Sequence, residues 1–129
     1  MDQDLLVVGA AKLAEELEKR VGPLALFMLL APDTETDDAW HLIVSAPGFD
    51  ARPRTKAIGE IIDLLRSDLP KAAWERVLRV TVLRTSEPFV RGMNTTFNAE
   101  HSVRHLNSVN IAGVEIPRAV LFESRKVAA

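Results

Sequence analysis

The chain has 129 residues, with 16 basic and 18 acidic side chains, 47% hydrophobic residues and no cysteine. This length suits a single domain that buries enough surface to fold without disulfides or bound metal. The slight acidic excess disfavours nucleic-acid binding, and the lack of cysteine excludes disulfide frameworks, thiol nucleophiles and cysteine-ligated metal sites. The longest apolar run, 24–31, is far shorter than the roughly 20 residues of a membrane-spanning helix. We therefore expect a soluble, cytoplasmic protein with no membrane contact.

The first half of the chain alternates between helical and strand patterns. Apolar residues recur every three or four positions over 4–21, which predicts a helix that a Gly-Pro pair ends. Residues 24–31 and 39–46 predict two strands, joined most simply as a hairpin. A second helix is expected over 53–69, with a buried face made of Ile58, Ile61, Ile62, Leu65 and Leu69.

The second half of the chain predicts three more strands. Residues 77–84 follow the second long helix and are expected to complete a crossover unit with the strand before it. A short third helix is expected near 98–106. Residues 108–111 and 114–123 then form a closing hairpin, and the tail from about residue 124 is expected to fray.

Together these elements predict a single α+β domain over residues 1–129. About five strands form a mostly antiparallel or mixed sheet. The two long helices, near 4–21 and 53–69, pack on this sheet, and the short helix near 98–106 is the third. The sequence leaves the order of the strands open.

Two histidines four residues apart suggest a metal site. On the expected short helix, His101 and His105 project from one side, which is a spacing that can hold a metal ion. Glu100 precedes the first histidine, whereas the zinc-protease pattern places a glutamate directly after it. Arg104 lies near the two histidines, where its charge opposes a cation. A third ligand has to come from elsewhere, and the alternative is a solvated helix surface.

A second candidate is a basic turn at the start of the second helix. Arg52, Arg54 and Lys56 gather there, next to backbone N–H groups that a helix start leaves free. Such groups can hold a phosphate or a carboxylate. The turn lacks the glycine and lysine spacing of a nucleotide-triphosphate loop, so the alternative is a turn with long side chains in water.

The third candidate is the polar segment 91–110. All four asparagines and two of the three histidines lie between residues 85 and 110. Arg91 and Asn94, with Arg104 and the two histidines, are the candidate residues of a small-molecule, anion or metal site or of a small enzyme. Turns also collect such residues, because Asn side chains bond nearby backbone.

The remaining motifs fail on spacing. The acidic segment 33–38 resembles the start of a calcium loop but lacks its glycine and its final glutamate. Residues 5–11 lack the glycines of a dinucleotide fingerprint, and no serine lies in a nucleophile elbow. These failures make an enzyme the less favoured hypothesis.

We therefore expect a non-catalytic, self-associating protein-interaction or regulatory module, without a cofactor. Its support is the high apolar content of a small chain with short strands, since an exposed sheet edge or face can pair with a second copy. A homodimer is the expected assembly, and another protein partner is possible. The alternative hypothesis is the ligand site or small enzyme in segment 91–110.

Overall fold

A computed structural model describes residues 2–31 and 39–127, so the acidic segment 33–38 lies outside the described residues. The strands and helices form one α+β domain with a mixed five-stranded sheet in the order β3-β2-β1-β5-β4. In chain order the elements are α1 (Asp2–Val21), β1 (Leu26–Ala31), β2 (Trp40–Ser45), α2 (Pro47–Asp50), α3 (Arg54–Asp68), α4 (Lys71–Trp74), β3 (Val77–Val82), α5 (Pro88–Thr96), β4 (Arg104–Ile111) and β5 (Val114–Ser124). Among the described residues, no helix is both long and apolar enough to cross a membrane.

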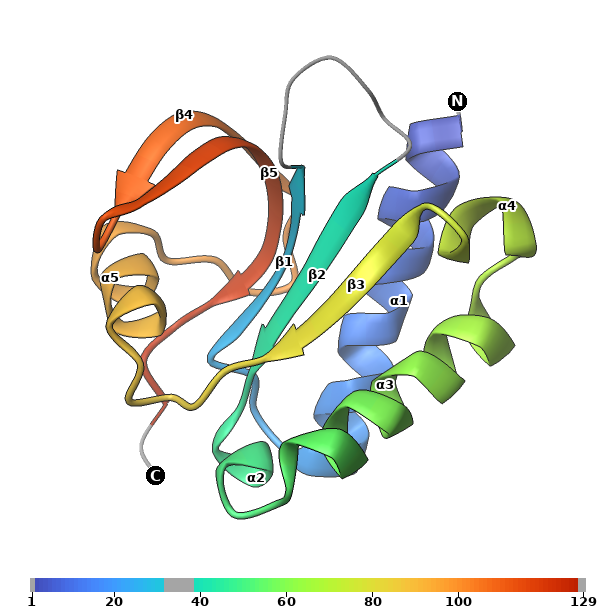
Figure 1. Ribbon diagram of the computed structural model, residues 1–129, viewed down its shortest axis with the longest axis horizontal. Helices are drawn as coiled ribbons and strands as arrows, with labels where there is room; N and C mark the ends of the chain where they lie inside the picture. Colours follow the sequence, from blue (N-terminus) through green and yellow to red (C-terminus); the bar gives the residue numbers. More distant parts are fainter. Residues whose placement is uncertain (1, 32–38, 128–129) are drawn as a thin grey trace.

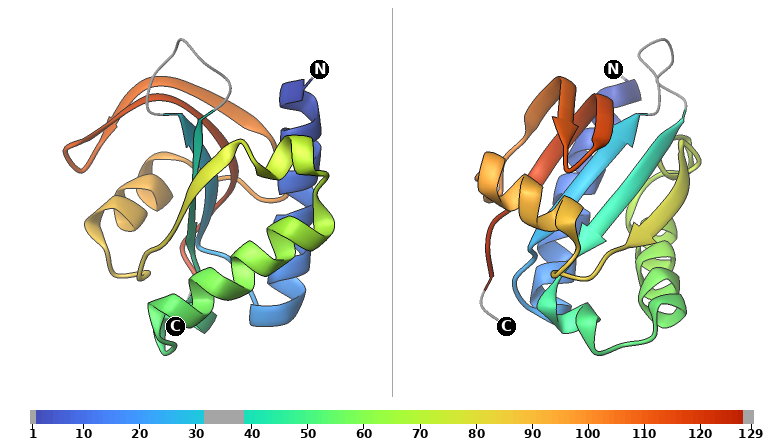
Figure 2. Two further views of the ribbon diagram at one scale, coloured as in Figure 1. Left: turned by 45° about the vertical axis from the view of Figure 1, so that its right-hand side comes forward. Right: turned by 60° about the vertical axis from the view of Figure 1, so that its left-hand side comes forward.

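Helices lie on both faces of the sheet (Figures 1 and 2). The helices α1 and α3 cover one face, here called the α1 face, and α5 lies against the other, here called the α5 face. A separate cluster of buried apolar side chains fills each side. On the α1 face, the rings of Phe27 and Phe122 pack edge to face with their centroids 5.7 Å apart. On the α5 face, Met28 of β1 and Met93 of α5 are both fully buried.

The strand pairings follow from the local sequence patterns. Strands β1 and β2 are antiparallel, whereas β2 and β3 are parallel and joined through α3, so the expected hairpin and crossover are both confirmed. Strands β4 and β5 form the closing hairpin. Its two turn residues, Ala112 and Gly113, have φ values of 52° and 83°. Positive φ at both central positions is the geometry that matches the twist of a two-residue hairpin.

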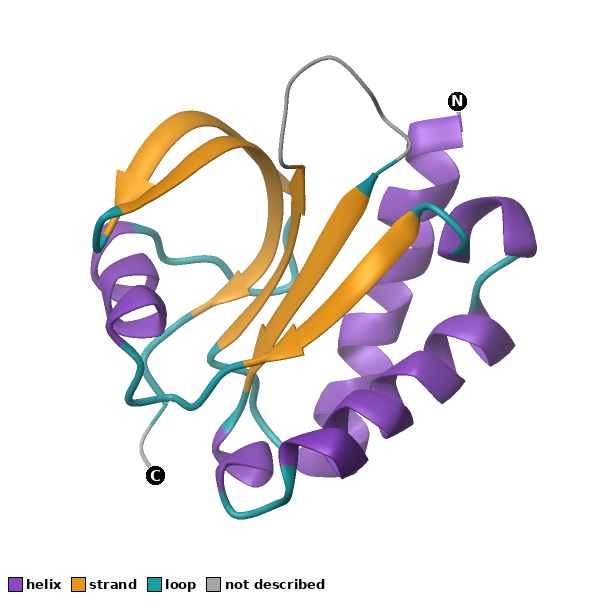
Figure 3. Cartoon of the chain, in the orientation of Figure 1, coloured by secondary structure: helices purple, strands orange, loops and turns teal. Residues whose placement is uncertain are grey.

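Our prediction of a short helix near 98–106 is wrong. The short helix of this region is α5, which lies earlier and ends at Thr96, and residues 97–103 form a loop that leads into β4 (Figure 3). The backbone N–H and C=O of Ala99 bond to Ser124 of β5, over 2.9 and 2.8 Å. This tertiary pairing overrides the local helical spacing of apolar residues. In α5 itself, Pro88 occupies the first turn, where a missing N–H costs nothing.

Candidate metal centre

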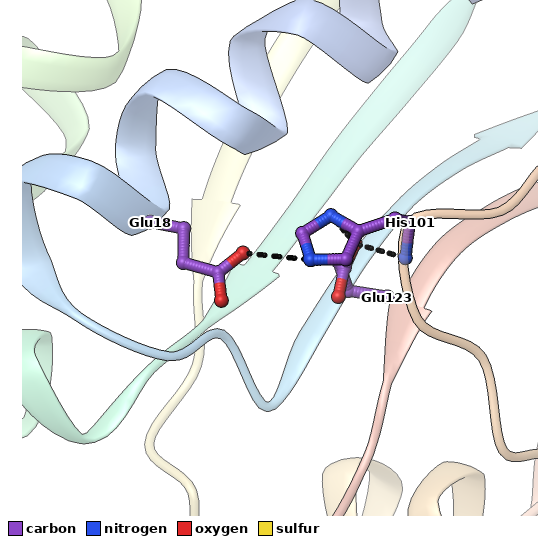
Figure 4. Close-up of side chains that lie close together, drawn as sticks. All are labelled: Glu18, His101 and Glu123. Atoms are coloured by element: carbon purple, nitrogen blue, oxygen red, sulfur yellow. Dashed lines mark hydrogen bonds and ion pairs between the residues drawn. The ribbon is translucent and has the colours of Figure 1, made fainter.

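Three side chains from distant parts of the sequence meet around one imidazole ring (Figure 4). His101 lies in the loop between α5 and β4, Glu18 in the last turns of α1, and Glu123 near the end of β5. The Nε2 atom of His101 is 3.5 Å from Oε2 of Glu18, and its Nδ1 atom is 3.4 Å from Oε2 of Glu123. One potential ligand atom from each residue lies within 4.8 Å of the other two. We call these three residues the Glu-His-Glu cluster.

The end of α1 fixes the position of Glu18. The N–H of Gly22 bonds to the backbone carbonyl of Glu18 over 2.9 Å, and Gly22 has a φ of 91°. Glycine adopts this left-handed conformation without strain and so ends the helix there. The apolar stripe of α1 is buried, with Leu17 fully inaccessible to solvent. Glu18 therefore sits at the rim of a packed helix, one turn before its end.

A β-bulge directs Glu123 to the α1 face. Phe27 of β1 pairs with Glu123, but the next residue, Met28, pairs with Leu121, which leaves Phe122 as an extra residue in β5. The ring of Phe122 packs into the core of the α1 face. Glu123 follows it towards α1 instead of alternating to the α5 face, and so lies beside His101.

His101 adopts an uncommon backbone conformation at the point where it meets Glu123. Its φ is 47°, in the left-handed region that few residues other than glycine and asparagine occupy. The backbone N–H of His101 donates to Oε2 of Glu123 over 2.6 Å. The pairing of Ala99 with Ser124 on one side, and the bond from the N–H of Ser102 to the carbonyl of Phe122 on the other, hold the loop around this contact. Backbone and ring of His101 thus both face the same carboxylate.

Glu123 is a buried carboxylate with one unused oxygen. The residue is 1% exposed, and Oε1 has no hydrogen-bond partner. Burial raises the pKa of Glu123, while the N–H and the charge of His101 oppose this rise. A buried oxygen without a donor costs about 1–3 kcal/mol. A cation bound by this carboxylate would stabilise its ionised form.

Arg125 orients Glu18 from outside the cluster. Its Nη2 atom donates to Oε1 of Glu18 over 2.9 Å, and its Nη1 atom donates to Oε1 of Glu100 over 2.7 Å. These contacts occupy one oxygen of Glu18 and leave the other, Oε2, facing His101. The hydrogen bond from Arg125 to Glu100 is the largest cause of the raised pKa of Arg125. Partners of this kind commonly hold metal ligands in their binding orientation.

The donor set suits a divalent transition metal. One imidazole nitrogen and two carboxylate oxygens are ligands that Zn²⁺ and its neighbours accept. Ligand atoms around a tetrahedral Zn²⁺ ion lie roughly 3.3 Å apart, given bond lengths of about 2.0–2.1 Å. The two carboxylates face different nitrogens of the ring, so a single ion can bind all three residues only after the side chains of His101 and Glu18, which are 53% and 25% exposed, rotate. Buried Glu123 provides the fixed ligand.

The structure separates the other residues predicted for segment 91–110. Among them only His101 belongs to the Glu-His-Glu cluster. His105 and Arg104 lie in β4, with the Arg104 guanidinium 5.2 Å from the centroid of the Phe97 ring. Because residues 97–103 are not helical, the two histidines do not share a helix face. Arg91 and Asn94 belong to α5, on the opposite side of the sheet.

The basic turn lies at the start of α3. Arg52 pairs with Glu60 over 2.8 Å, and Arg54 approaches Glu87 with an N–O distance of 3.7 Å. Lys56 lines a groove that also contains acidic side chains. The two arginines therefore already have carboxylate partners, and anion binding by this turn stays a prediction.

Sequence reasoning missed two of the three cluster residues. Glu18 resembled any polar residue on the exposed side of a helix. Glu123 carried a signal, since it follows the apolar run 119–122 in a strand expected to be largely buried. A carboxylate in such a place needs a partner. Nothing local in the sequence identified His101 as that partner.

Comparisons of the chain with protein-family models, with curated proteins and with solved structures find no match. Any functional assignment therefore depends on the geometry of the chain itself.

Proposed function

We propose that this chain is a metal-binding domain that holds one divalent transition-metal ion in the Glu-His-Glu cluster. The observation that carries the proposal is Glu123, a buried carboxylate whose Oε1 atom lacks a partner while its Oε2 atom lies 3.4 Å from a histidine nitrogen. Glu18 supplies a second carboxylate on the other side of the same ring. This is the metal-binding form of the alternative hypothesis, with two ligands that the sequence did not reveal.

The ion's role in this proposal is to link three segments of the fold. Its ligands come from α1, from the loop 97–103 and from β5. Binding to the folded chain alone stabilises it by about 2.7 kcal/mol when the free metal is at 100 times its dissociation constant. In this proposal the ion acts as a regulatory or structural clamp.

Equilibrium dialysis of untagged protein against Zn²⁺ at pH 7.5 tests this function. The unmodified chain should bind one ion, and the His101→Asn variant should bind it at least tenfold more weakly. Asparagine tolerates the left-handed backbone at this position, so the loop keeps its shape. His105→Asn is the matched control, because it removes the exposed histidine of β4 and should leave binding unchanged. Absence of zinc binding, or equal losses in both variants, would contradict the proposal.

Protons compete with the ion for the same three residues. Glu123 must be ionised and the coordinating nitrogen of His101 must be free of its proton before either can bind a metal. Because both residues bind the ion only without their protons, and the pKa of Glu123 is raised, zinc affinity should increase with pH, with release of protons into the buffer. Isothermal titration calorimetry in two buffers of different ionisation enthalpy measures this release.

We propose self-association through β3 as a second candidate function. This strand is at one end of the five-stranded sheet, and its Leu78 side chain is 69% exposed. Hollows of about 180 and 190 Å³ lie next to Leu78, and Trp74 and Trp40 are among their linings. A second copy related by a two-fold axis could place its own Leu78 in one of these hollows, which is the reciprocal contact of a symmetric dimer.

Light scattering after size-exclusion chromatography tests this second candidate. A dimer has twice the 14.3 kDa mass of the chain, and Leu78→Asp should convert it to monomer. Val114→Asp is the control, because Val114 is also exposed but belongs to the β4–β5 hairpin. A monomer at all concentrations, or a dimer that survives Leu78→Asp, would contradict this mode of association.

A further inference from the structure

We infer that the α5 face carries a second, separate binding site, for a small molecule with an oxyanion group such as a phosphate or a carboxylate. The site is a pocket of about 690 Å³ beside α5. It is bounded by α5, by the turn before this helix and by the segment that follows β5, which lie together in Figure 1. Its lining comprises Ala25, Thr85, Ser86, Arg91, Asn94, Thr95, Lys126 and Val127.

The charge of the lining selects an anion. Arg91 and Lys126 both line the pocket, and no carboxylate does. Within the described part of the chain, neither cation takes part in an ion pair. A groove of about 570 Å³ next to α3 is different, since its two cations are balanced by Glu60 and Asp63. The α5 pocket therefore carries two positive charges that a ligand can neutralise.

Helix α5 presents its polar residues to the pocket on one side. Arg91, Asn94 and Thr95 are spaced three and four residues apart, so they share a helix face. The Asn94 amide donates to the carbonyl of Ala25 over 2.8 Å and to the hydroxyl of Ser124 over 3.2 Å. These bonds fix the helix to the residue before β1 and to the end of β5. The arginine is thus held on a wall that is already anchored in the folded chain.

The turn before α5 is anchored by a separate contact. Asp50 at the end of α2 accepts hydrogen bonds from the backbone N–H and the hydroxyl of Thr85. The hydroxyl of Thr85 is therefore already hydrogen-bonded, and the contact fixes the turn that carries Ser86. Ser86 is exposed at the pocket and is a second kind of donor for a ligand oxygen.

The size and the donors define the ligand class. Sites for small molecules usually have volumes of about 300–1,000 Å³, a range that contains this pocket. A guanidinium forms paired hydrogen bonds with the oxygens of a phosphate or carboxylate, and an ammonium adds a point charge. Arg91 and Lys126 therefore bind the anionic group of the ligand, and Ser86 contacts its polar remainder, since the hydroxyl of Thr95 already donates to the carbonyl of Arg91 over 2.9 Å.

Titration of ¹⁵N-labelled, metal-free protein tests this site. Inorganic phosphate and citrate are added separately, at constant ionic strength, and amide shifts are followed by NMR. Saturable shifts are expected at Ser86, Arg91 and Thr95 for at least one of the two anions. Saturation by phosphate alone identifies a phosphorylated ligand, and saturation by citrate alone identifies a carboxylate ligand.

Two double variants of equal net charge make the test specific. Arg91→Gln/Lys126→Gln should weaken binding at least tenfold. Arg66→Gln/Arg104→Gln removes two cations that lie over Trp74 and Phe97, and it should bind as the unmodified chain does. Shifts that never saturate with either anion, or equal weakening in both double variants, would overturn the inference. The His101→Asn variant should bind the anion normally, so this outcome does not depend on the metal site.

Discussion

Glu123 shows how one residue changes the chemistry of a strand. The four residues before it, 119–122, are apolar and buried, and the carboxylate interrupts this run at the bulge. The sequence predicted the strand, but alternation alone would have placed Glu123 on the face opposite Phe122. The extra residue of the bulge could not be predicted, because it depends on the register between β5 and β1.

Glu123→Gln should have opposite effects on stability and on metal binding. The amide has nearly the same shape, still accepts the bond from the N–H of His101, and needs no charge in a buried place. The metal-free variant should therefore be more stable than the unmodified chain, by about 1 kcal/mol at pH 7.5. Its zinc affinity should fall at least tenfold. Urea denaturation with and without zinc measures both, and a loss of stability without metal would contradict this account of Glu123.

Two glycines give a second prediction at the scale of single residues. A Cβ atom on Gly48 would lie 2.3 Å from the backbone carbonyl oxygen of Val21, whereas one on Gly59 of α3 would have no neighbour within 4 Å. Gly48→Ala should destabilise the chain by about 1–3 kcal/mol, since backbone must move. Gly59→Ala should stabilise it by about 0.5–1 kcal/mol, because glycine weakens a helix interior. Urea denaturation of the two variants checks both signs, and a stable Gly48→Ala variant would contradict the close contact.

At the scale of elements, the periodicity of apolar residues predicted the helices and strands that local sequence determines. It failed where a segment pairs with a strand distant in the sequence. The long helices, the first hairpin and the crossover all follow from the patterns of consecutive segments of the chain. The segment 98–106 carries apolar residues at helical spacing, yet Ala99 pairs with Ser124 and Leu106 belongs to β4. That outcome depends on a partner strand whose position the sequence left open.

Arg125 should contribute to holding three elements together. It bonds to Glu18 of α1, to Glu100 of the loop and, more weakly, to the carbonyl of Leu24. Arg125→Gln should lower the free energy of unfolding by about 1 kcal/mol, and by less in 1 M NaCl, because the Debye length falls to about 3 Å.

The control for this prediction is a simpler ion pair within α1, the helix that carries Glu18. Arg20 pairs with Glu16 one turn away within α1, and the side chains are 50% and 37% exposed. Arg20→Gln should change the free energy of unfolding by only a few tenths of a kcal/mol. Equal losses in the two variants would show that Arg125 is an ordinary surface charge. Chemical denaturation at low and high salt provides the comparison.

At the scale of the whole molecule, the sheet order assembles the cluster. Strand β5 runs antiparallel to β1, so the end of β5 lies beside the start of β1, which follows α1 after only four residues. This arrangement brings residue 123 next to residue 18. The sequence supplied His101 as a candidate, but its partners depend on a strand order that local patterns do not determine. Only the three-dimensional arrangement identifies the site.

Two titrating groups, the buried Glu123 and the half-buried His41, should shape the pH dependence of the whole fold in opposite directions. Burial raises the pKa of Glu123, so the folded state holds a proton that the unfolded state has released, and stability falls as the pH rises from 4.5 through the folded-state value. Burial and the charge of Arg79 lower the pKa of His41. As the pH falls, the unfolded state takes up a proton on His41 before the folded state does. The contribution of His41 to stability is therefore present above pH 6.5 and is lost as the pH falls below this value.

His41→Gln should separate these two effects. In the folded chain, Nε2 of His41 lies 2.6 Å from the hydroxyl of Thr81, and glutamine can keep a hydrogen bond there without titrating. Between pH 7.5 and pH 5.5, the unmodified chain should lose more stability than the His41→Gln variant, because only the former must keep an imidazole neutral. When the range is extended to pH 4.5, Glu123→Gln should lose more stability than the unmodified chain, because it lacks the gain that protonation of Glu123 provides. Urea denaturation at each pH gives the free energy of unfolding of the three proteins. If His41→Gln loses as much stability as the unmodified chain, His41 is not the source of the acid sensitivity.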